Sequence, residues 1–126
     1  MAAPAPPVRV AVLGAGSWGI NHVRVLAAEP RCRIVAVAEP DEGKRRRIAE
    51  LAPAAQWTAS AEAIVRSPEI EAVVIAAPAS THVELALAAF EAGKHVLVEK
   101  PLAMCSKETA DLIEEAERRK RVLMGR

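Results

Sequence analysis

A glycine-rich turn that joins an apolar run to an amphipathic segment constrains this chain more than any other feature. Five of the six residues from Val8 to Leu13 are apolar and three of them are valine, which is typical of a strand buried on both faces of a parallel sheet. Gly14, Gly16 and Gly19 follow in G-x-G-x-x-G spacing. The first such glycine allows a tight turn, the second lets a pyrophosphate lie against the backbone, and the third lets the next helix pack closely on the strand. The N-terminus of that helix attracts an anion.

An acidic residue stands where a bound dinucleotide would need one. The next apolar run, from Ile34 to Ala38, ends at Glu39, twenty residues after Gly19. A carboxylate at the tip of a second strand can accept hydrogen bonds from an adenosine ribose, and Pro40 keeps Glu39 in an extended conformation. The order of strand, glycines, helix, strand and acid predicts dinucleotide binding. The alternative is a tight strand-to-helix turn that binds no ligand.

The composition fits one α/β domain and argues against several other classes. The 126 residues are 52% apolar, which suits a sheet buried between helices, and the net charge of +1 points to neither nucleic acid nor membrane. The proline-rich residues 1–7 lack the features of a signal peptide and are expected to form a flexible tail. We therefore expect a soluble, cytoplasmic protein. Cys32 and Cys105 fit no metal-ligand spacing, so we expect structural thiols and no metal site.

Apolar runs and helical patterns alternate along the chain. Strands are expected at 8–13, 34–38, 55–57, 72–77, 95–99 and 122–124. Helices are expected from Ser17 to Ala28, after an Asp41 cap, from Ser60 to Val65, and from Ser106. A further helix is expected between a Thr81–Glu84 capping box and a C-terminal cap at Gly93. Their inward-facing residues should include Val23, Leu26, Ala27, Ile48, Leu51, Val83, Leu87, Phe90, Leu112, Ile113 and Ala116. The alternation predicts an α/β fold, a Rossmann-type doubly wound parallel sheet of about six strands with flanking helices, in a single domain over residues 8–126.

Two polar segments close strands near the expected cofactor. One is A-A-P-A-S-T-H at 76–82, and the other is Glu99-Lys100-Pro101. A lysine between an acid and a proline at the mouth of a buried strand can hydrogen-bond a substrate hydroxyl or help to move its proton. From its position alone, Lys100 could equally be a solvated charge at a strand end.

Four segments of the sequence resemble the Gfo/Idh/MocA oxidoreductases, a family that includes glucose–fructose oxidoreductase and inositol dehydrogenase. They are G-A-G-S-W-G at 14–19, A-V-A-E-P-D at 36–41, V-V-I-A-A-P-A-S-T-H at 73–82 and E-A-G-K-H-V-L-V-E-K-P-L-A at 91–103. The resemblance runs from Val8 to the end of the chain and implies the N-terminal NAD(P)-binding domain of such an enzyme. It also implies that Lys100 lies beside the nicotinamide, orients the substrate and handles its proton.

The same resemblance implies which residues contact the cofactor and suggests a cis peptide bond. Besides Gly14, Gly16, Gly19 and Glu39, the expected contacts are Ser17, Trp18, Ala77, Pro78, His82, Glu99 and Pro101. The Lys100–Pro101 peptide is a candidate cis bond. His82 has a second interpretation, in which it caps or packs at the start of a helix. The A-A-P-A-S-T-H segment most resembles the sequences of the nucleotide-sugar 3-dehydrogenase branch of the family.

The sequence departs from the family in lacking the second α/β domain that supplies the substrate pocket. We therefore expect the NAD-binding domain of an oxidoreductase that acts on a sugar, cyclitol or nucleotide-sugar hydroxyl, and expect this chain to bind cofactor without turnover. Apolar surface that a second domain would cover should favour self-association. The alternative function is a non-catalytic nucleotide-binding or redox-sensing module. A third possibility is that the glycines form the similar turn of a methyltransferase, but that motif favours an acidic residue at the position occupied by Leu13.

The cofactor preference depends on Glu39, which should accept from both ribose hydroxyls and repel a 2′-phosphate. This favours NAD and makes NADP the less expected cofactor. The basic run from Lys44 to Arg47 opposes this preference, but we expect it to form a solvated helix face. A second basic run, from Arg118 to Arg121, should close the last helix, where positive charge suits the helix dipole. Neither run has interleaved aromatic residues, so neither predicts nucleic-acid binding.

Overall fold

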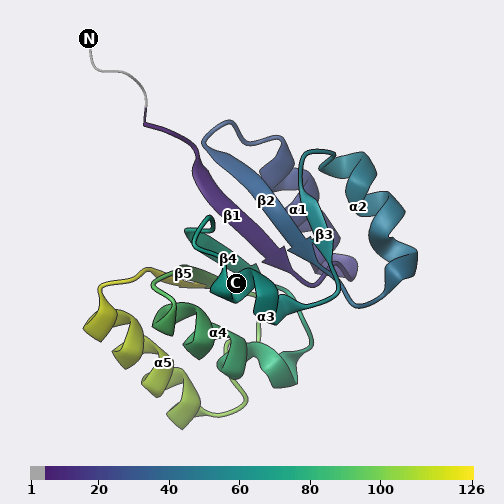
Figure 1. The fold of residues 1–126 in the computed structure, drawn as a ribbon. Coiled ribbons are helices and arrows are strands. Elements are labelled where there is room, and N and C mark those ends of the chain that lie inside the picture. Colours follow the sequence, from purple (N-terminus) through teal and green to yellow (C-terminus); the bar gives the residue numbers. More distant parts are fainter. Residues whose placement is uncertain (1–4) are drawn as a thin grey trace.

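Six parallel strands form one sheet at the centre of the structure (Figure 1). The structure is a computed structural model that describes residues 5–126. Residues 1–4 of the expected tail lie outside the described residues, and residues 5–7 are exposed and irregular. The strands are β1 (Val8–Leu13), β2 (Cys32–Ala38), β3 (Gln56–Thr58), β4 (Ala72–Ile75), β5 (His95–Val98) and β6 (Leu123–Gly125). Their order across the sheet is β3-β2-β1-β4-β5-β6 and each neighbouring pair is parallel, which confirms the predicted doubly wound sheet.

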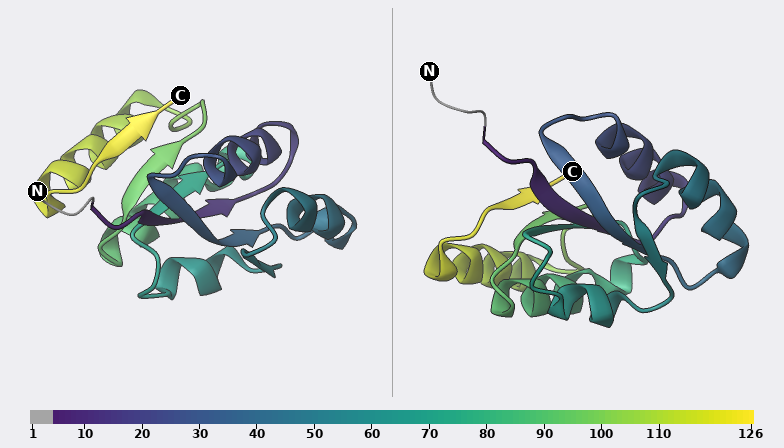
Figure 2. Two further views of the ribbon diagram at one scale, coloured as in Figure 1. Left: turned by 90° about the horizontal axis from the view of Figure 1, so that it is seen from above. Right: turned by 45° about the horizontal axis from the view of Figure 1, so that its top comes forward.

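Helices cover both faces of this sheet. They are α1 (Ser17–Ala27), α2 (Arg45–Leu51), α3 (Ala61–Arg66), α4 (His82–Glu91) and α5 (Ser106–Arg119), with short 3-10 turns at Glu42–Lys44 and Ala79–Thr81. α1 and α2 lie on one face, and α3, α4 and α5 form a row on the other (Figure 1 and the right view of Figure 2). Within residues 5–126, no helix combines the length and the apolarity that a membrane span requires.

Side chains of β1 alternate between two hydrophobic cores, one on each face of the sheet. Val10 and Val12 join the core under α1 and α2, together with Val23 and Ile48. Ala11 and Leu13 join the other core, which also contains Ile75, Ala86, Phe90, Val98 and Leu112. Phe90 is fully buried, and burial of a side chain of this size stabilises the fold by about 1.5–3 kcal/mol relative to exposure.

Three of the predicted helix ends are confirmed in detail. The Asp41 carboxylate accepts a hydrogen bond from the Gly43 amide at 2.9 Å, and the Ser60 hydroxyl oxygen accepts one from the Ala63 amide at 3.5 Å. Gly93 follows α4 with a positive φ of 79°, as expected of a glycine that ends a helix.

The predicted Thr81–Glu84 capping box is wrong. A 3-10 turn begins at Ala79, so the chain is already helical at Thr81 and the Thr81 side chain caps no amide. The Thr81 hydroxyl instead donates to the Pro78 carbonyl oxygen at 2.7 Å. The start of α4 is therefore tied to the end of the loop that follows β4.

Two residues predicted to face inward are exposed. Ile113 is 45% exposed, because α5 buries a narrow stripe that passes through Leu112 and Ala116, one turn apart. Ala27 is exposed because it is the last residue of α1, where the chain turns toward β2.

A buried lysine links β5 to the loop that precedes β4. The Lys94 ammonium donates to the Ser67 carbonyl oxygen at 2.6 Å and to the Ile70 carbonyl oxygen at 2.8 Å, and Lys94 is only 3% exposed. Burial disfavours the charged form and lowers the pKa of Lys94 below its usual 10.5.

This lowered pKa predicts a pH-dependent contribution to stability. The unfolded chain binds more protons at Lys94 than the folded chain, so its contribution is fully present above pH 10.5 and decreases as the pH falls through the lowered pKa of the folded state. Urea unfolding of the wild type and Lys94→Met, from neutral pH to about 10.5, should therefore show that the wild type gains stability with pH relative to the variant.

The comparison between the two proteins removes the opposing effect of Cys32. Burial raises the pKa of the Cys32 thiol, so that group lowers stability at alkaline pH, but it is present in both proteins. Parallel pH profiles for the wild type and Lys94→Met would contradict the assignment.

Candidate functional site

The carboxyl ends of β1 and β4 lie side by side at the point where the strand order reverses, the usual place for a ligand in an open α/β sheet. Gly14 follows β1 with a φ of 96°, and its amide donates to the Ala38 carbonyl oxygen at 2.7 Å. A Cβ at this position would lie 2.7 Å from the Ala76 carbonyl oxygen. The turn therefore requires glycine both for its conformation and for its contact with the end of β4.

α1 begins directly on this turn. A Cβ on Gly19 would lie 2.0 Å from the Gly14 carbonyl oxygen, so only glycine lets the helix approach so closely. Gly16 is the N-cap residue of α1, where no side chain caps the helix, and a Cβ there would meet nothing within 4 Å. The positive end of the α1 dipole thus faces open space across bare backbone, which suits an anion such as pyrophosphate.

Glu39 is held in place by backbone amides on both sides. It is 6% exposed; one carboxylate oxygen accepts from the Ala15 amide at 2.8 Å, and the other accepts from the Asp41 amide at 2.8 Å. Each carboxylate oxygen can accept more than one hydrogen bond, so Glu39 can fix the glycine turn and still accept from a ligand. This anchoring of the turn by Glu39 was not predicted from the sequence.

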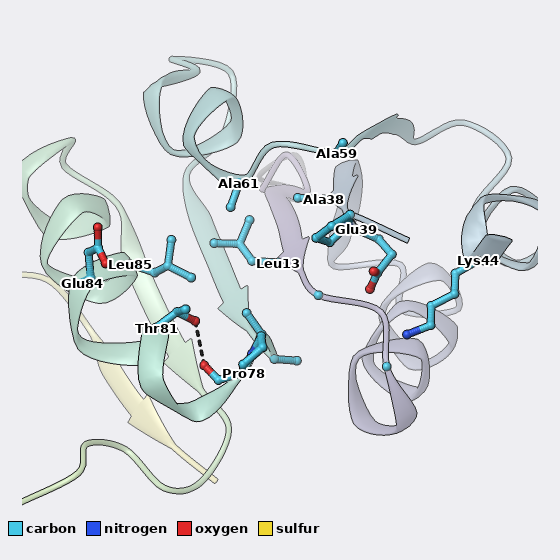
Figure 3. Close-up of a pocket in the computed structure, with 15 residues that line it drawn as sticks. Leu13, Ala38, Glu39, Lys44, Ala59, Ala61, Pro78, Thr81, Glu84 and Leu85 are labelled. Atoms are coloured by element: carbon cyan, nitrogen blue, oxygen red, sulfur yellow. Dashed lines mark hydrogen bonds between the residues drawn. The ribbon is translucent and has the colours of Figure 1, made fainter. Parts of the chain in front are cut away.

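A cavity of about 630 Å³ lies over these groups (Figure 3). Its size falls in the usual range of ligand sites. It is lined by Leu13, Gly14, Gly16, Ala38, Glu39, Pro40, Lys44, Ala59, Ala61, Ala76, Ala77, Pro78, Thr81, Glu84 and Leu85. The walls are mostly apolar, with Glu39 and Lys44 on one side and Thr81 and Glu84 on the other (Figure 3). Such a lining suits a flat heterocycle joined to a sugar.

A smaller cavity of about 310 Å³ shares Ala76 and Ala77 with the first. Its other lining residues are Ser17, Trp18, Ala79, His82, Glu99 and Lys100. β4 ends at Ile75, two residues before the predicted end, and the two alanines beyond it form the common wall. The two cavities therefore adjoin across the end of β4, as the two halves of a dinucleotide would require.

Glu99 and Lys100 follow β5 and line the smaller cavity. Glu99 is buried, and its carboxylate lies 2.5 Å from His22 Nε2 and 3.4 Å from the Arg126 guanidinium. Lys100 is exposed at the mouth of the cavity. The Lys100–Pro101 peptide is cis, as the resemblance suggested.

His82 packs as a buried residue rather than presenting a free ring nitrogen to the cavity. It is 2% exposed; Nδ1 lies 2.7 Å from the Pro101 carbonyl oxygen, and Nε2 lies 2.8 Å from the Ala77 carbonyl oxygen. A neutral imidazole can donate to one of these carbonyls, and an imidazolium can donate to both. Both ring nitrogens are therefore engaged by the protein's own backbone.

The structure separates the predicted site residues into groups. Gly14, Gly16, Glu39, Ala77 and Pro78 line the larger cavity, and Ser17, Trp18, Ala77, His82, Glu99 and Lys100 line the smaller one. Gly19 and Pro101 line neither cavity, although both contact residues that do.

Two residues at the site were missed or misplaced by the sequence analysis. His22 pairs with Glu99 across 77 positions, and the signal available was its spacing four residues after Trp18, which places both on one face of α1. Lys44 was expected on a solvated face, but it is half-buried and lines the larger cavity. Arg45, Arg46 and Arg47 are exposed, as predicted.

Comparisons with known proteins point to one family. The sequence model of the GFO_IDH_MocA oxidoreductases, an NAD-binding Rossmann fold, matches residues 8–125. The scyllo-inositol 2-dehydrogenase (NAD(+)) of Bacillus subtilis is 35% identical over 103 residues, which cover 81% of this chain and 30% of that protein. Inositol 2-dehydrogenase 1 of Saccharopolyspora erythraea is 43% identical over 98 residues, which cover 76% of this chain and 29% of that protein.

This chain is also similar to a solved structure of an oxidoreductase. The crystal structure of a 3-ketoreductase from Actinomadura kijaniata, in complex with NADP and TDP-benzene, matches with a TM-score of 0.86 and 30% identity, over 94% of this chain and 36% of that chain. The chain thus spans about a third of the length of the proteins it matches.

Two glycine substitutions should separate folding from ligand binding. Gly19→Ala places a methyl group against the Gly14 carbonyl oxygen and should lower the free energy of unfolding by more than about 3 kcal/mol, at the severe end of overpacking. Gly16→Ala meets no atom and should change stability by no more than about 1 kcal/mol, the usual effect of such a change at an N-cap.

Gly16→Ala should nevertheless weaken dinucleotide binding, because its methyl group occupies the space through which an anion reaches the α1 amides. Urea unfolding and calorimetric titration with NAD measure the two effects. Unchanged NAD affinity in a folded Gly16→Ala protein would show that the glycine turn does not hold the phosphates.

Proposed function

This chain belongs to the Gfo/Idh/MocA oxidoreductase family as its NAD-binding Rossmann domain, and we propose that it is the cofactor-binding domain of an enzyme that acts on a ring hydroxyl. The proposed substrate is a sugar, cyclitol or nucleotide sugar. Inositol dehydrogenases among the relatives support the cyclitol class, and the 3-ketoreductase crystallised with TDP-benzene supports the nucleotide sugars. The observation that carries the proposal is the pair of cavities that meet at Ala76 and Ala77, with Glu39 at one end and Lys100 at the other.

The residues of the two cavities fit the parts of a dinucleotide in order. Glu39 would accept hydrogen bonds from the adenosine ribose, and Gly16 leaves room for the pyrophosphate at the N-terminus of α1. Ser17, Trp18 and Ala77 would surround the nicotinamide end. When bound, the nicotinamide would exchange a hydride with the substrate carbon.

Lys100 is the proposed catalytic residue. Among residues 5–126 it is the one lysine that lines the smaller cavity. Its amino group can hydrogen-bond the reacting hydroxyl and help to move its proton as the carbonyl forms or is reduced. Hydride transfer also needs the substrate held close to the nicotinamide with water excluded. Because the chain spans about a third of its relatives' length, we propose that it binds cofactor without turnover by itself.

Glu39 is also the proposed origin of a preference for NAD over NADP. Its buried carboxylate lies in the wall of the larger cavity, where its negative charge would repel a 2′-phosphate. Lys44 lines the same cavity and partly offsets this repulsion, so the preference should be moderate.

Replacing the carboxylate by an amide tests the preference. Glu39→Gln removes the negative charge and one strong acceptor, so it should weaken NAD binding roughly tenfold and narrow the difference between NAD and NADP. The ratio of the two affinities is the critical reading, because any disturbance of the turn at Ala15 affects both cofactors alike.

Glu42→Gln is the matched control, since Glu42 is exposed on the neighbouring 3-10 turn and does not line the cavity. Calorimetry with both cofactors should show the wild-type ratio in this control. A wild type that binds NADP more tightly than NAD, or an unchanged ratio in Glu39→Gln, would overturn the assignment.

The function itself is tested by titrating the chain with NAD, NADP and S-adenosylmethionine. The proposal expects binding of the nicotinamide dinucleotides and none of S-adenosylmethionine, whose binding would indicate a methyltransferase. We also propose that the chain self-associates through exposed apolar side chains such as Met104, Val122 and Met124. A monomer at high concentration in sedimentation experiments would argue against this last point.

A further inference from the structure

Lys100 is the exposed residue between two anchored neighbours. On one side, the Glu99 carboxylate is held by His22 of α1. On the other side, the Pro101 carbonyl oxygen lies 2.7 Å from His82 Nδ1 of α4. The Glu99 side chain and the Pro101 carbonyl are therefore each held by a histidine, and the two histidines come from helices on opposite faces of the sheet. The Lys100 side chain remains exposed and lines the cavity.

The other ring nitrogen of His82 faces the other wall of the same cavity. His82 Nε2 lies 2.8 Å from the carbonyl oxygen of Ala77, a residue shared by both cavities. One buried ring thus fixes the distance between the end of β4 and the segment that carries Lys100. Because both ring nitrogens are occupied by backbone carbonyls, His82 has no ring nitrogen free to bind a ligand.

We propose that His82 is a positioning residue for Lys100: it joins Ala77 to Pro101 and so holds the Lys100 amino group at the nicotinamide end of the site. This inference rests on the proposed function of the two cavities. It differs from the expectation that His82 contacts the cofactor, and also from simple packing at the start of α4. Packing alone would leave the two ends of a bound dinucleotide equally affected by a change at His82.

The test compares two ligands that differ at one end. NADH and ADP-ribose share the adenosine, the pyrophosphate and the second ribose, and NADH alone carries the nicotinamide. His82→Phe keeps a ring of similar width and removes the two ring nitrogens that face the Ala77 and Pro101 carbonyl oxygens. It should weaken NADH binding about tenfold, the usual scale for loss of hydrogen bonds in a buried site, and change ADP-ribose binding by less than about twofold, within the effect expected of a distant change.

Lys100→Ala then shows whether His82 acts through Lys100. The single variant should also weaken NADH selectively, and His82→Phe should add little further loss in the Lys100→Ala background, because a positioning residue has no effect once its target is gone. Additive losses would show that His82 touches the ligand itself, and no effect of Lys100→Ala beside a loss in His82→Phe would show that another route is used. Either result overturns the inference.

A third histidine provides the matched control. His95 is the first residue of β5, at the amino end of the strand and away from the carboxyl ends where the site lies, and its Nδ1 accepts from the Val122 amide at 2.9 Å. His95→Phe should bind both ligands as the wild type does. Equal losses of NADH and ADP-ribose in His82→Phe, or no loss of either, would reduce His82 to a structural residue and overturn the inference.

A milder variant and a ligand-free measurement cover the case in which His82→Phe does not fold. His82→Gln keeps one donor and should lose NADH affinity by a smaller factor, with the same dependence on Lys100. In the ligand-free chain, the Glu99 amide, which donates to the Ile75 carbonyl oxygen at 3.0 Å, should exchange its hydrogen faster in His82→Gln while the amides of β1 keep their protection. A wild-type chain that binds neither ligand would defeat the proposed function itself, which distinguishes that failure from a failure of the His82 assignment.

Discussion

The site depends on the close approach of three backbone segments. The turn after β1, the first turn of α1 and the end of β4 meet where a Cβ on Gly14 or Gly19 would overlap a carbonyl oxygen. This contact brings the N-terminus of α1 to the carboxyl edge of the sheet at the point where the strand order reverses. The positive end of the helix and the mouth of the larger cavity then coincide without any charged side chain on the turn, because the backbone itself supplies the donors.

Polar side chains around this turn are fixed by the protein before any ligand arrives. Glu39 is bonded to amides of Ala15 and Asp41, and Glu99 is paired with His22. Buried polar groups are stable only when they have such partners. The same hydrogen bonds that satisfy burial therefore set the geometry of the site, so that little ordering is needed on binding.

Local patterns in the sequence predicted the parts of the structure that depend on local spacing. The glycine turn, the position of Glu39 and the buried strands follow from residue types and periods within short windows, and the parallel, doubly wound sheet follows from the alternation of strands and helices. The pairing of His22 with Glu99 and the two carbonyl partners of His82 join segments far apart in the chain, so no local pattern contains them. The predictions that Ile113 faces inward and that Thr81 caps a helix were wrong for a related reason. The width of a helix's buried stripe and the residue at which a helix begins both depend on what packs beside them.

One dinucleotide should span both cavities across the end of β4. A crystal of this chain soaked with NAD should therefore show continuous density, with the adenosine ribose at Glu39, the pyrophosphate over Gly16, and the nicotinamide between Trp18 and Lys100. A crevice that stays empty at saturating NAD, or density confined to a site away from Ala76 and Ala77, would contradict it.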